Sequence, residues 1–250
     1  QRVWGVPITV FLNKNTGEIL RDVDVTERIA KEVEKKGADA WFTEDPQKFL
    51  GDKYDSSQYE GVQDILDVWF DSGSTHSFVL NSSKQKWPAD LYLEGSDQHR
   101  GWFQSSLLES CGTRGRAPFD AVLTHGFVLD GQGRKMSKSI GNVISPQEII
   151  KKSGSDILRL WVAMTDTTED VRISPEVLKG VSESYRRLRN TIRFTIGALN
   201  DFSESESMKK ESIPELDRWV LHRLKELDLL LKKSVKNYTF QSFYSELNTF

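Results

Sequence analysis

The fold is decided by residues 90–129, which begin with Asp90-Leu-Tyr-Leu-Glu94 and end with Asp120-Ala-Val-Leu-Thr-His-Gly-Phe-Val-Leu129. Both ends are rich in the apolar and β-branched residues that strands favour. Between them, Phe103, Leu107 and Cys111 recur every four residues and predict one face of a helix over 98–111. A strand, a helix and a strand joined by short connections are typical of a parallel βαβ unit. The stretch therefore predicts an α/β fold.

The residues before this stretch predict further elements. Val6–Leu12 and Ile65–Phe70 have the composition of strands. Asp24-Val-Thr-Glu27 has the form of a capping box and predicts a helix over 25–36. Residues 43–63 are polar and aperiodic, so we expect a surface connection there.

After Gly141 the chain takes on a helical pattern. Ser145-Pro-Gln-Glu148 has the form of a capping box, and apolar residues at helical spacing predict a short helix over 157–164. Ser174-Pro175 opens a long helix whose apolar stripe runs to Leu199. Ser212-Ile-Pro-Glu215 predicts the start of another. We expect an α/β part followed by helices.

Composition limits the classes of protein and site. The 250 residues carry 34 basic and 37 acidic side chains, a net charge of −3, which argues against coating nucleic acid over the whole surface but allows a local basic patch. No apolar run reaches the roughly 18–20 residues of a membrane helix. Cys111 alone cannot form an internal disulfide, and the histidines at 76, 99, 125 and 222 lack zinc-ligand spacing. We therefore expect no protein-bound metal.

A lysine loop gives the strongest chemical signal. It reads Gly126-Phe-Val-Leu-Asp-Gly-Gln-Gly-Arg-Lys135-Met-Ser-Lys138-Ser-Ile-Gly-Asn142, and its glycines allow it to bend. Lys135 and Lys138, with Ser137 and Ser139 beside them, can bring two ammonium groups and hydroxyl donors onto a polyanion. In phosphoryl chemistry such a loop stabilises the charge on a departing pyrophosphate. A solvated basic turn is the alternative.

A second signal follows the predicted strand at 90–94. It reads Glu94-Gly-Ser-Asp97-Gln98-His99-Arg100-Gly-Trp102-Phe103 and begins at the carboxyl end of the strand, where open α/β sheets bind ligands. The acids and the amide suit an ammonium group and ribose hydroxyls, and Trp102 supplies an apolar wall. The alternatives are that Asp97 caps the following helix and that Trp102 belongs to the core.

Together these motifs resemble a known family. Lys135-Met-Ser-Lys-Ser139, after a strand and before a capped helix, resembles the second signature of the class I aminoacyl-tRNA synthetases. With residues 94–103, Asp67-Val-Trp69-Phe70-Asp71-Ser72-Gly73-Ser-Thr-His76 and the opening Trp4-Gly-Val-Pro-Ile8, the chain resembles the bacterial isoleucyl-tRNA synthetases over essentially its whole length. The resemblance implies the second half of a Rossmann-like catalytic domain followed by an α-helical domain.

The resemblance also implies roles for individual residues. Those expected to bind the isoleucyl-adenylate are Glu94, Gly95, Asp97, Gln98, Trp69 and Trp102, the two tryptophans bordering the isoleucine side chain. Those expected to bind ATP are Ser137, Lys138 and Ser139. Catalysis is assigned to Lys135 and Lys138.

Four arginines form a further candidate site. Arg186, Arg187, Arg189 and Arg193 fall mostly opposite the apolar stripe of the predicted long helix. Such a face can bind phosphates, although a solvated helix face is an equal alternative. The resemblance to the start of a synthetase's anticodon-binding domain favours contact with tRNA.

The implied domains are 1–145, with an insertion near 13–63, then a helical connection over 146–175 and a truncated anticodon-binding domain over 176–250. The implied activity joins isoleucine to tRNA(Ile) with ATP and Mg²⁺, in a cytoplasmic enzyme that is a monomer when complete. The alternatives are a piece of a valyl-tRNA synthetase and a non-catalytic tRNA-binding module. No His-x-Gly-His string occurs and both ends look cut, so we expect a piece of a larger protein that is inactive alone.

Overall fold

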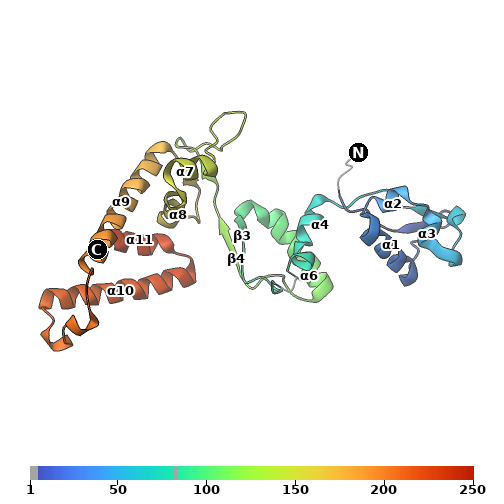
Figure 1. Cartoon of the computed structure of the whole chain (residues 1–250). Coiled ribbons are helices and arrows are strands. Elements are labelled where there is room, and N and C mark those ends of the chain that lie inside the picture. The colour runs from blue at the N-terminus through green and yellow to red at the C-terminus, as the bar shows by residue number, and fades with distance from the viewer. Residues whose placement is uncertain (1–4, 81–83) are drawn as a thin grey trace. The chain divides into compact units, whose positions relative to one another are not determined.

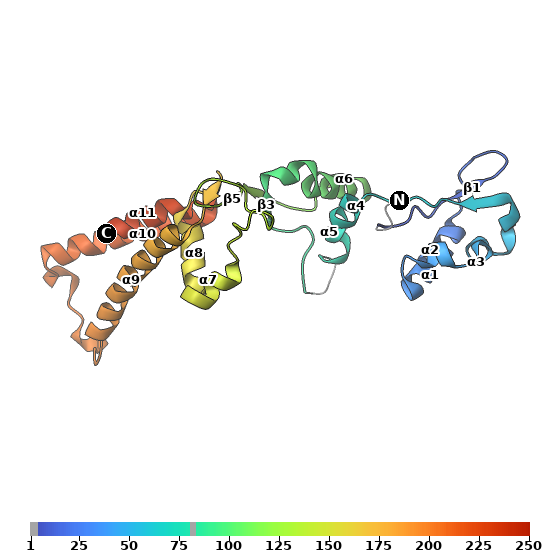
Figure 2. The same ribbon diagram turned by 90° about the horizontal axis from the view of Figure 1, so that it is seen from above.

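The computed structural model describes residues 5–80 and 84–250, which belong to two compact units, 1–123 and 124–250. Trp4, part of the opening motif, lies outside the described residues. Figures 1 and 2 show the elements of each unit in two views. The strands of the described residues form three two-stranded sheets, and helices make up most of the rest. This mixture agrees with the expected α/β class.

Unit 1 begins with a small module around an antiparallel pair of strands. β1 (Phe11–Asn13) pairs with β2 (Tyr59–Gly61), and Phe11 lies opposite Gly61. The helices of the module, blue in Figure 1, are α1 (Val23–Lys36), α2 (Ala40–Thr43) and α3 (Pro46–Leu50), followed by the 3-10 turns η1 (Gly51–Lys53) and η2 (Ser56–Gln58).

The core of the module is aromatic. The ring centroid of Trp41 lies 4.9 Å from that of Phe11 and 5.6 Å from that of Phe49, and Leu50 is fully buried. The surface connection expected over 43–63 is therefore wrong, because this segment supplies α3, β2 and part of the core. Its apolar anchors are separated by short polar turns, and so few anchors produce no periodicity.

The helix expected over 25–36 is confirmed as α1, but the capping box at 24–27 is wrong. Asp22 is the cap, and its carboxylate accepts hydrogen bonds from the backbone N–H of Asp24 at 2.8 Å and of Val25 at 3.4 Å. The carboxylate also accepts from the Lys53 ammonium at 2.6 Å and the Tyr54 hydroxyl at 2.8 Å. These bonds hold the pKa of Asp22 well below its usual range. The spacing of residues near Asp22 cannot predict these partners, because they lie far along the chain.

The predicted βαβ unit begins in the second part of unit 1 and ends at His125, the second residue of unit 2. It is formed by β3 (Tyr92–Gly95), α6 (Trp102–Arg114) and β4 (Val122–His125), with the 3-10 turn η3 (Ser96–Arg100) between β3 and α6. A parallel bridge between Ala89 and Phe119 leads into the sheet of β3 and β4. The parallel βαβ prediction is confirmed.

Two details of this region differ from prediction. The strand over 65–70 is wrong, because Asp67 accepts a hydrogen bond from the Trp69 N–H at 3.0 Å and caps α4 (Val68–Gly73), which is followed by α5 (Thr75–Phe78). A short apolar run cannot by itself distinguish a strand from a helix, and here the cap decides.

The buried face of α6 also differs. Phe103 is buried as expected, but Leu107 is 38% exposed and Cys111 is exposed, while Ser106 and Ser110 are fully buried. The hydroxyls of both serines are satisfied, one by Tyr92 and the other by the Arg116 carbonyl. Small hydrogen-bonded residues therefore occupy the interface where larger apolar ones were expected.

Unit 2 opens with short strands and then becomes helical. β5 (Val128–Leu129) pairs in parallel with β6 (Val171–Arg172), so the strand expected over 120–129 is divided into β4 and β5. The helices that follow are α7 (Pro146–Ser153), α8 (Ser155–Met164), α9 (Pro175–Ala198), α10 (Glu215–Asn237) and α11 (Phe240–Thr249), with the 3-10 turns η4 (Glu204–Glu206) and η5 (Lys210–Ser212). Their buried core residues are Ile149, Ile157, Trp161, Val171, Ile173 and Val181.

The predicted helix starts in unit 2 are partly confirmed. Ser174 accepts a hydrogen bond from the Val177 N–H at 3.2 Å and caps α9. Ser145 is the N-cap residue of α7, but its hydroxyl bonds to the Gln147 side chain and makes no capping box. α10 begins after Pro214 and has no side-chain cap, so the cap expected at 212–215 is wrong. The apolar stripe of α9 is buried only near its start. The division at 145 and 175 stays a prediction.

Candidate active site

The end of β3 presents the predicted polar residues in turn. Glu94 is exposed, and its carboxylate accepts a hydrogen bond at 3.1 Å from the N–H of Gly95, which is buried. Gln98 accepts at 3.2 Å from the N–H of Trp102 at the start of α6. Asp97 is exposed and caps no helix, so the alternative that it caps the helix after the strand is contradicted. The Glu94 and Asp97 carboxylates thus lie on the surface at the carboxyl end of a strand.

The two tryptophans lie beside this strand end. Trp102 stacks on Tyr92, with the ring centroids 4.3 Å apart and the planes 4° apart, and its indole N–H donates to the Ser72 carbonyl at 3.0 Å. Trp69 is 43% exposed, and a side chain at Gly101 would begin 2.8 Å from its ring. The structure therefore brings both rings to the start of α6, with Trp102 held by packing and Trp69 open.

Two further titratable groups lie on α5 and α6, in the same unit as the strand end. His76 is 3% exposed, and neither of its ring nitrogens finds a hydrogen-bond partner within residues 5–80 and 84–250. Burial, and then the charge of Arg114, lower the pKa of His76. Burial, and then the charge of Asp71, raise the pKa of Glu109. Glu109 was not a predicted residue, and its polar side chain on α6 gave no signal in the sequence.

The base of the lysine loop is a buried carboxylate. Asp130 is 7% exposed, and one oxygen accepts hydrogen bonds from the backbone N–H of Gln132 at 3.0 Å and of Arg134 at 2.8 Å. The other oxygen accepts from the Asn142 amide at 2.9 Å and the Arg134 guanidinium at 3.0 Å. These bonds, that of Asn142 most of all, hold the pKa of Asp130 far below its ordinary value.

Asn142 extends these contacts along the loop. Its amide oxygen accepts a hydrogen bond from the Ser137 N–H at 2.9 Å, and its nitrogen donates to the Lys135 carbonyl at 3.1 Å. The hydroxyls of Ser137 and Ser139 lie 3.1 Å apart. Gly141 has φ +71°, a conformation that glycine adopts readily, and its N–H donates to the Ser137 carbonyl. The backbone around both lysines is thus fixed.

The two lysines differ in their surroundings. The Lys135 ammonium lies over the Phe127 ring, 4.3 Å from its centroid, a cation–π contact. Lys138 is exposed, and no hydrogen bond or ion pair holds its ammonium within the part of the chain that the structure describes. Lys138 is therefore the more accessible cation for a polyanion.

The four predicted arginines are all exposed on α9. Arg187 reaches the Asn248 side chain on α11 at 3.4 Å. No ion pair neutralises these arginines within the described residues, so α9 carries an uncompensated basic face.

Comparison with known proteins identifies the family. Residues 1–174 match the family described as tRNA synthetases class I (I, L, M and V). The chain belongs to the class I tRNA synthetases.

The class I synthetase chain has close curated relatives. It is 59% identical over 251 residues to the isoleucine–tRNA ligase of Zymomonas mobilis, covering 100% of this chain and 27% of that protein. It is 55% identical over 254 residues to the isoleucine–tRNA ligase of Pelagibacter ubique, covering 100% and 28%. The chain therefore spans about a quarter of the length of these relatives.

Solved structures show the class I synthetase fold. The complex of Agrobacterium radiobacter LeuRS with tRNA and LeuAMS matches with a TM-score of 0.74 at 18% identity, over 98% of this chain and 34% of that one. Methionyl-tRNA synthetase of Mycobacterium tuberculosis in complex with methionyl-adenylate matches with a TM-score of 0.62 at 18% identity, over 74% and 38%. The predicted fold class is confirmed.

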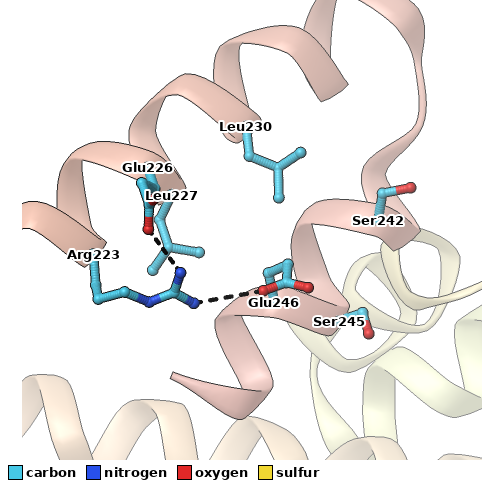
Figure 3. Close-up of a pocket in the computed structure, with 7 residues that line it drawn as sticks. All are labelled: Arg223, Glu226, Leu227, Leu230, Ser242, Ser245 and Glu246. Atoms are coloured by element: carbon cyan, nitrogen blue, oxygen red, sulfur yellow. Dashed lines mark hydrogen bonds and ion pairs between the residues drawn. The ribbon is translucent and has the colours of Figure 1, made fainter.

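A hollow of about 530 Å³ lies elsewhere in the class I synthetase chain, between α10 and α11 (Figure 3). Its arginine, Arg223, points at two carboxylates, Glu226 at 2.7 Å and Glu246 at 3.7 Å. Because both acids neutralise this arginine, the contacts indicate a structural link between the helices and not an anion site.

Two kinds of feature are absent from residues 5–80 and 84–250 of the class I synthetase chain. No helix there is long and apolar enough to cross a bilayer. Within the same residues, no three His, Cys, Asp or Glu side chains gather closely enough to hold a metal ion.

Proposed function

We propose that the chain is part of an isoleucine–tRNA ligase, which activates isoleucine with ATP and transfers it to tRNA(Ile). The observation that carries this proposal is the 59% identity to the Zymomonas mobilis isoleucine–tRNA ligase, which extends over the whole chain. Because the relatives are isoleucine–tRNA ligases, the alternative of a valyl-tRNA synthetase is not favoured. A non-catalytic tRNA-binding module is disfavoured because it would need neither the lysine loop nor the acids at the strand end.

The strand end would bind the amino acid and the adenylate. In activation, an isoleucine carboxylate oxygen forms a bond to the α-phosphorus of ATP while the bond to pyrophosphate breaks. Glu94 and Asp97 carry exposed carboxylates that suit an ammonium group and ribose hydroxyls, with Gln98 and the close backbone at Gly95 beside them. The rings of Trp69 and Trp102 would form the apolar wall for the isoleucine side chain.

The lysine loop would bind ATP. The ammonium groups of Lys135 and Lys138 suit the negative charge that gathers on the departing pyrophosphate, and the hydroxyls of Ser137 and Ser139 can donate to phosphate oxygens. Mg²⁺ would enter with the nucleotide as part of the substrate. No protein nucleophile is required, because positioning and charge stabilisation lower the barrier.

The basic face of α9 would contact tRNA phosphates through Arg186, Arg187, Arg189 and Arg193. Phosphate contacts of this kind orient a nucleic acid without reading its sequence. A protein that acts on tRNA in translation is expected in the cytoplasm.

The proposal is tested by amino-acid-dependent exchange of pyrophosphate into ATP, measured on the full-length protein that carries these residues. Isoleucine should support exchange far better than valine. Lys138→Ala should slow exchange on the order of a hundredfold, because it removes a charge that stabilises the leaving group, and should leave the KM for isoleucine unchanged. Lys179→Ala, an exposed lysine on α9, is the matched control.

Two results would contradict the proposal. Exchange that depends on valine and not on isoleucine would overturn the choice of amino acid, and an unchanged rate in Lys138→Ala would remove that lysine from the mechanism. We expect the 250 residues alone to support no exchange, because they match only about a quarter of the relatives' length. Exchange at a comparable rate would show that the site is complete within them.

A further inference from the structure

The lysine loop consists of two hydrogen-bonded turns. The first is closed by backbone bonds between Asp130 and Arg134 and by the bridge between Leu129 and Lys135. The second is closed by the bond from the Gly141 N–H to the Ser137 carbonyl. Lys135 ends the first turn, and Lys138 lies within the second.

Side chains, not backbone, join the two turns. Within residues 5–80 and 84–250, the hydrogen bonds that pass from one turn to the other all involve Asn142, whose amide reaches the Asp130 carboxylate and the Lys135 carbonyl. The same amide accepts from the Ser137 N–H. The relative position of the two lysines therefore depends on this one amide and on the carboxylate that holds it.

The carboxylate is well suited to hold the amide. A buried charge is costly unless hydrogen bonds replace its lost water. Asp130 has two bonds on each oxygen, and the Arg134 guanidinium balances its charge at 2.9 Å. The surrounding lysines and serines are, by contrast, exposed or half-buried. The rigid part of the loop is thus its base, while its functional side chains remain available.

We propose that Asp130 and Asn142 form a latch that joins the two turns and thereby positions Lys135 and Lys138 on the triphosphate of ATP. Both are positioning residues, since the groups that meet the substrate are the two lysines. The inference rests on the proposed function of the loop in ATP binding. Without the latch the two ammonium groups lose their fixed spacing, and ATP must order the loop when it binds.

The test uses Asp130→Asn, Asn142→Ala and the double variant in the full-length protein. Asp130→Asn keeps the shape of the side chain but turns an amide donor toward the Asn142 amide and the Arg134 guanidinium. We expect each single variant to lower kcat/KM for ATP on the order of tenfold to a hundredfold, with the KM for isoleucine within twofold of the parent. The double variant should lose no more than the worse single variant, because both changes break one link.

The matched control is Asp55→Asn, in the other unit. Like Asp130, the Asp55 carboxylate accepts a hydrogen bond from the backbone N–H two residues further along the chain. The control variant should leave both parameters unchanged. The latch is overturned by a single variant with parental kcat/KM for ATP, or by losses that multiply in the double variant. It is also overturned by equal losses toward ATP and isoleucine with a lower melting temperature, which indicate a purely structural role.

A second measurement separates the latch from the proposed function. Trypsin should cleave after Lys135 and Lys138 severalfold faster in the single variants than in the parent and in Asp55→Asn. If the parent shows no isoleucine-dependent exchange but the variants are cleaved faster, the function is overturned and the latch stands. If cleavage rates are equal in an active parent and its variants, the latch is overturned and the function stands.

Discussion

The strand end and the lysine loop are held in place by different forces. At the strand end, Trp102 stacks on Tyr92 and Phe103 is buried, so apolar packing fixes the site. In the lysine loop, one carboxylate and one amide hold a backbone whose side chains are largely exposed. Disrupting a site that is fixed by packing also destabilises its unit. Hydrogen bonds within a surface loop, by contrast, can be broken while the unit stays folded.

The largest effect should come from Trp102→Ala, which removes the packed ring at the strand end. Loss of the stacked ring and of its hydrogen bond to Ser72 should lower the free energy of unfolding by about 2–4 kcal/mol. Thermal and urea unfolding measure this loss. Trp69→Ala is the control, and because that ring is 43% exposed, its cost should be below about 1.5 kcal/mol. Equal costs would contradict the distinction between a packed ring and an open one.

Glu94→Gln should weaken ligand binding without changing stability, because Glu94 is exposed although it lies at the packed strand end. The variant should bind a non-hydrolysable isoleucyl-adenylate analogue roughly tenfold to a hundredfold more weakly, since it loses a charged hydrogen-bond partner. Titration calorimetry measures the affinity, and the melting temperature should barely move. Glu60→Gln, an exposed glutamate on β2, is the control. Equal affinity would remove Glu94 from the site, and a large melting shift would indicate a structural carboxylate.

Mild acid should lower the stability of the unit that carries the strand end before it affects the base of the lysine loop. The folded-state pKa of His76 is lowered, so below about pH 6.5 the unfolded chain binds a proton that the folded chain does not. The free energy of unfolding should therefore fall as the pH drops, by at most about 1.4 kcal/mol per pH unit for one proton. Asp130 also has a lowered pKa, and its contribution is complete above about pH 4 and lost only below it.

Urea unfolding at pH 7.5 and pH 5.5 measures this difference. His76→Gln, which cannot take up the proton, should remove part of the loss between the two pH values. His222→Gln, at an exposed position, should leave the loss unchanged. The same pH dependence in all three proteins would show that the burial of His76 does not control it.

The smallest effect concerns Phe127, which the Lys135 ammonium covers. Binding of ATP by the loop as proposed would draw this lysine away from the ring, a contact worth about 0.5–1 kcal/mol. Phe127→Leu should therefore lower the KM for ATP by about twofold to fivefold, while Phe127→Tyr, which keeps a ring, should leave it unchanged. Steady-state exchange at varied ATP measures both. A higher KM in Phe127→Leu would show that the ring presents the lysine and does not compete for it.

The sequence predicted elements well where packing is local and periodic. The order of β3, α6 and β4 follows from two strand-like runs with a helical segment between them, and the start of α9 follows from its Ser174 cap, but spacing alone gave the wrong buried face of α6. Prediction failed where a distant partner or a single cap decides, as with Asp22, whose partners Lys53 and Tyr54 lie more than thirty residues away.

For the candidate site, the sequence indicated the residues that we expect to meet a ligand and missed those that hold the loop around them. The lysines, serines and Glu94 stand in recognisable motifs. Asp130 and Asn142 stand within the loop motif, and the motif assigns no role to either. Both are residue types that commonly bond to nearby backbone, which is the signal that could have found them. Which backbone they bond to depends on how the loop bends, and spacing does not reveal that.

The junction between β4 and β5 has a consequence for how far this sequence can vary. A Cβ at Gly126 would lie 2.3 Å from the backbone of Glu169, so a segment more than forty residues away blocks every side chain there. Gly180 and Gly197, on α9, meet no atom within 4 Å and could be replaced freely on steric grounds. In a saturation library, we expect position 126 to retain only glycine, while most substitutions survive at 180 and 197.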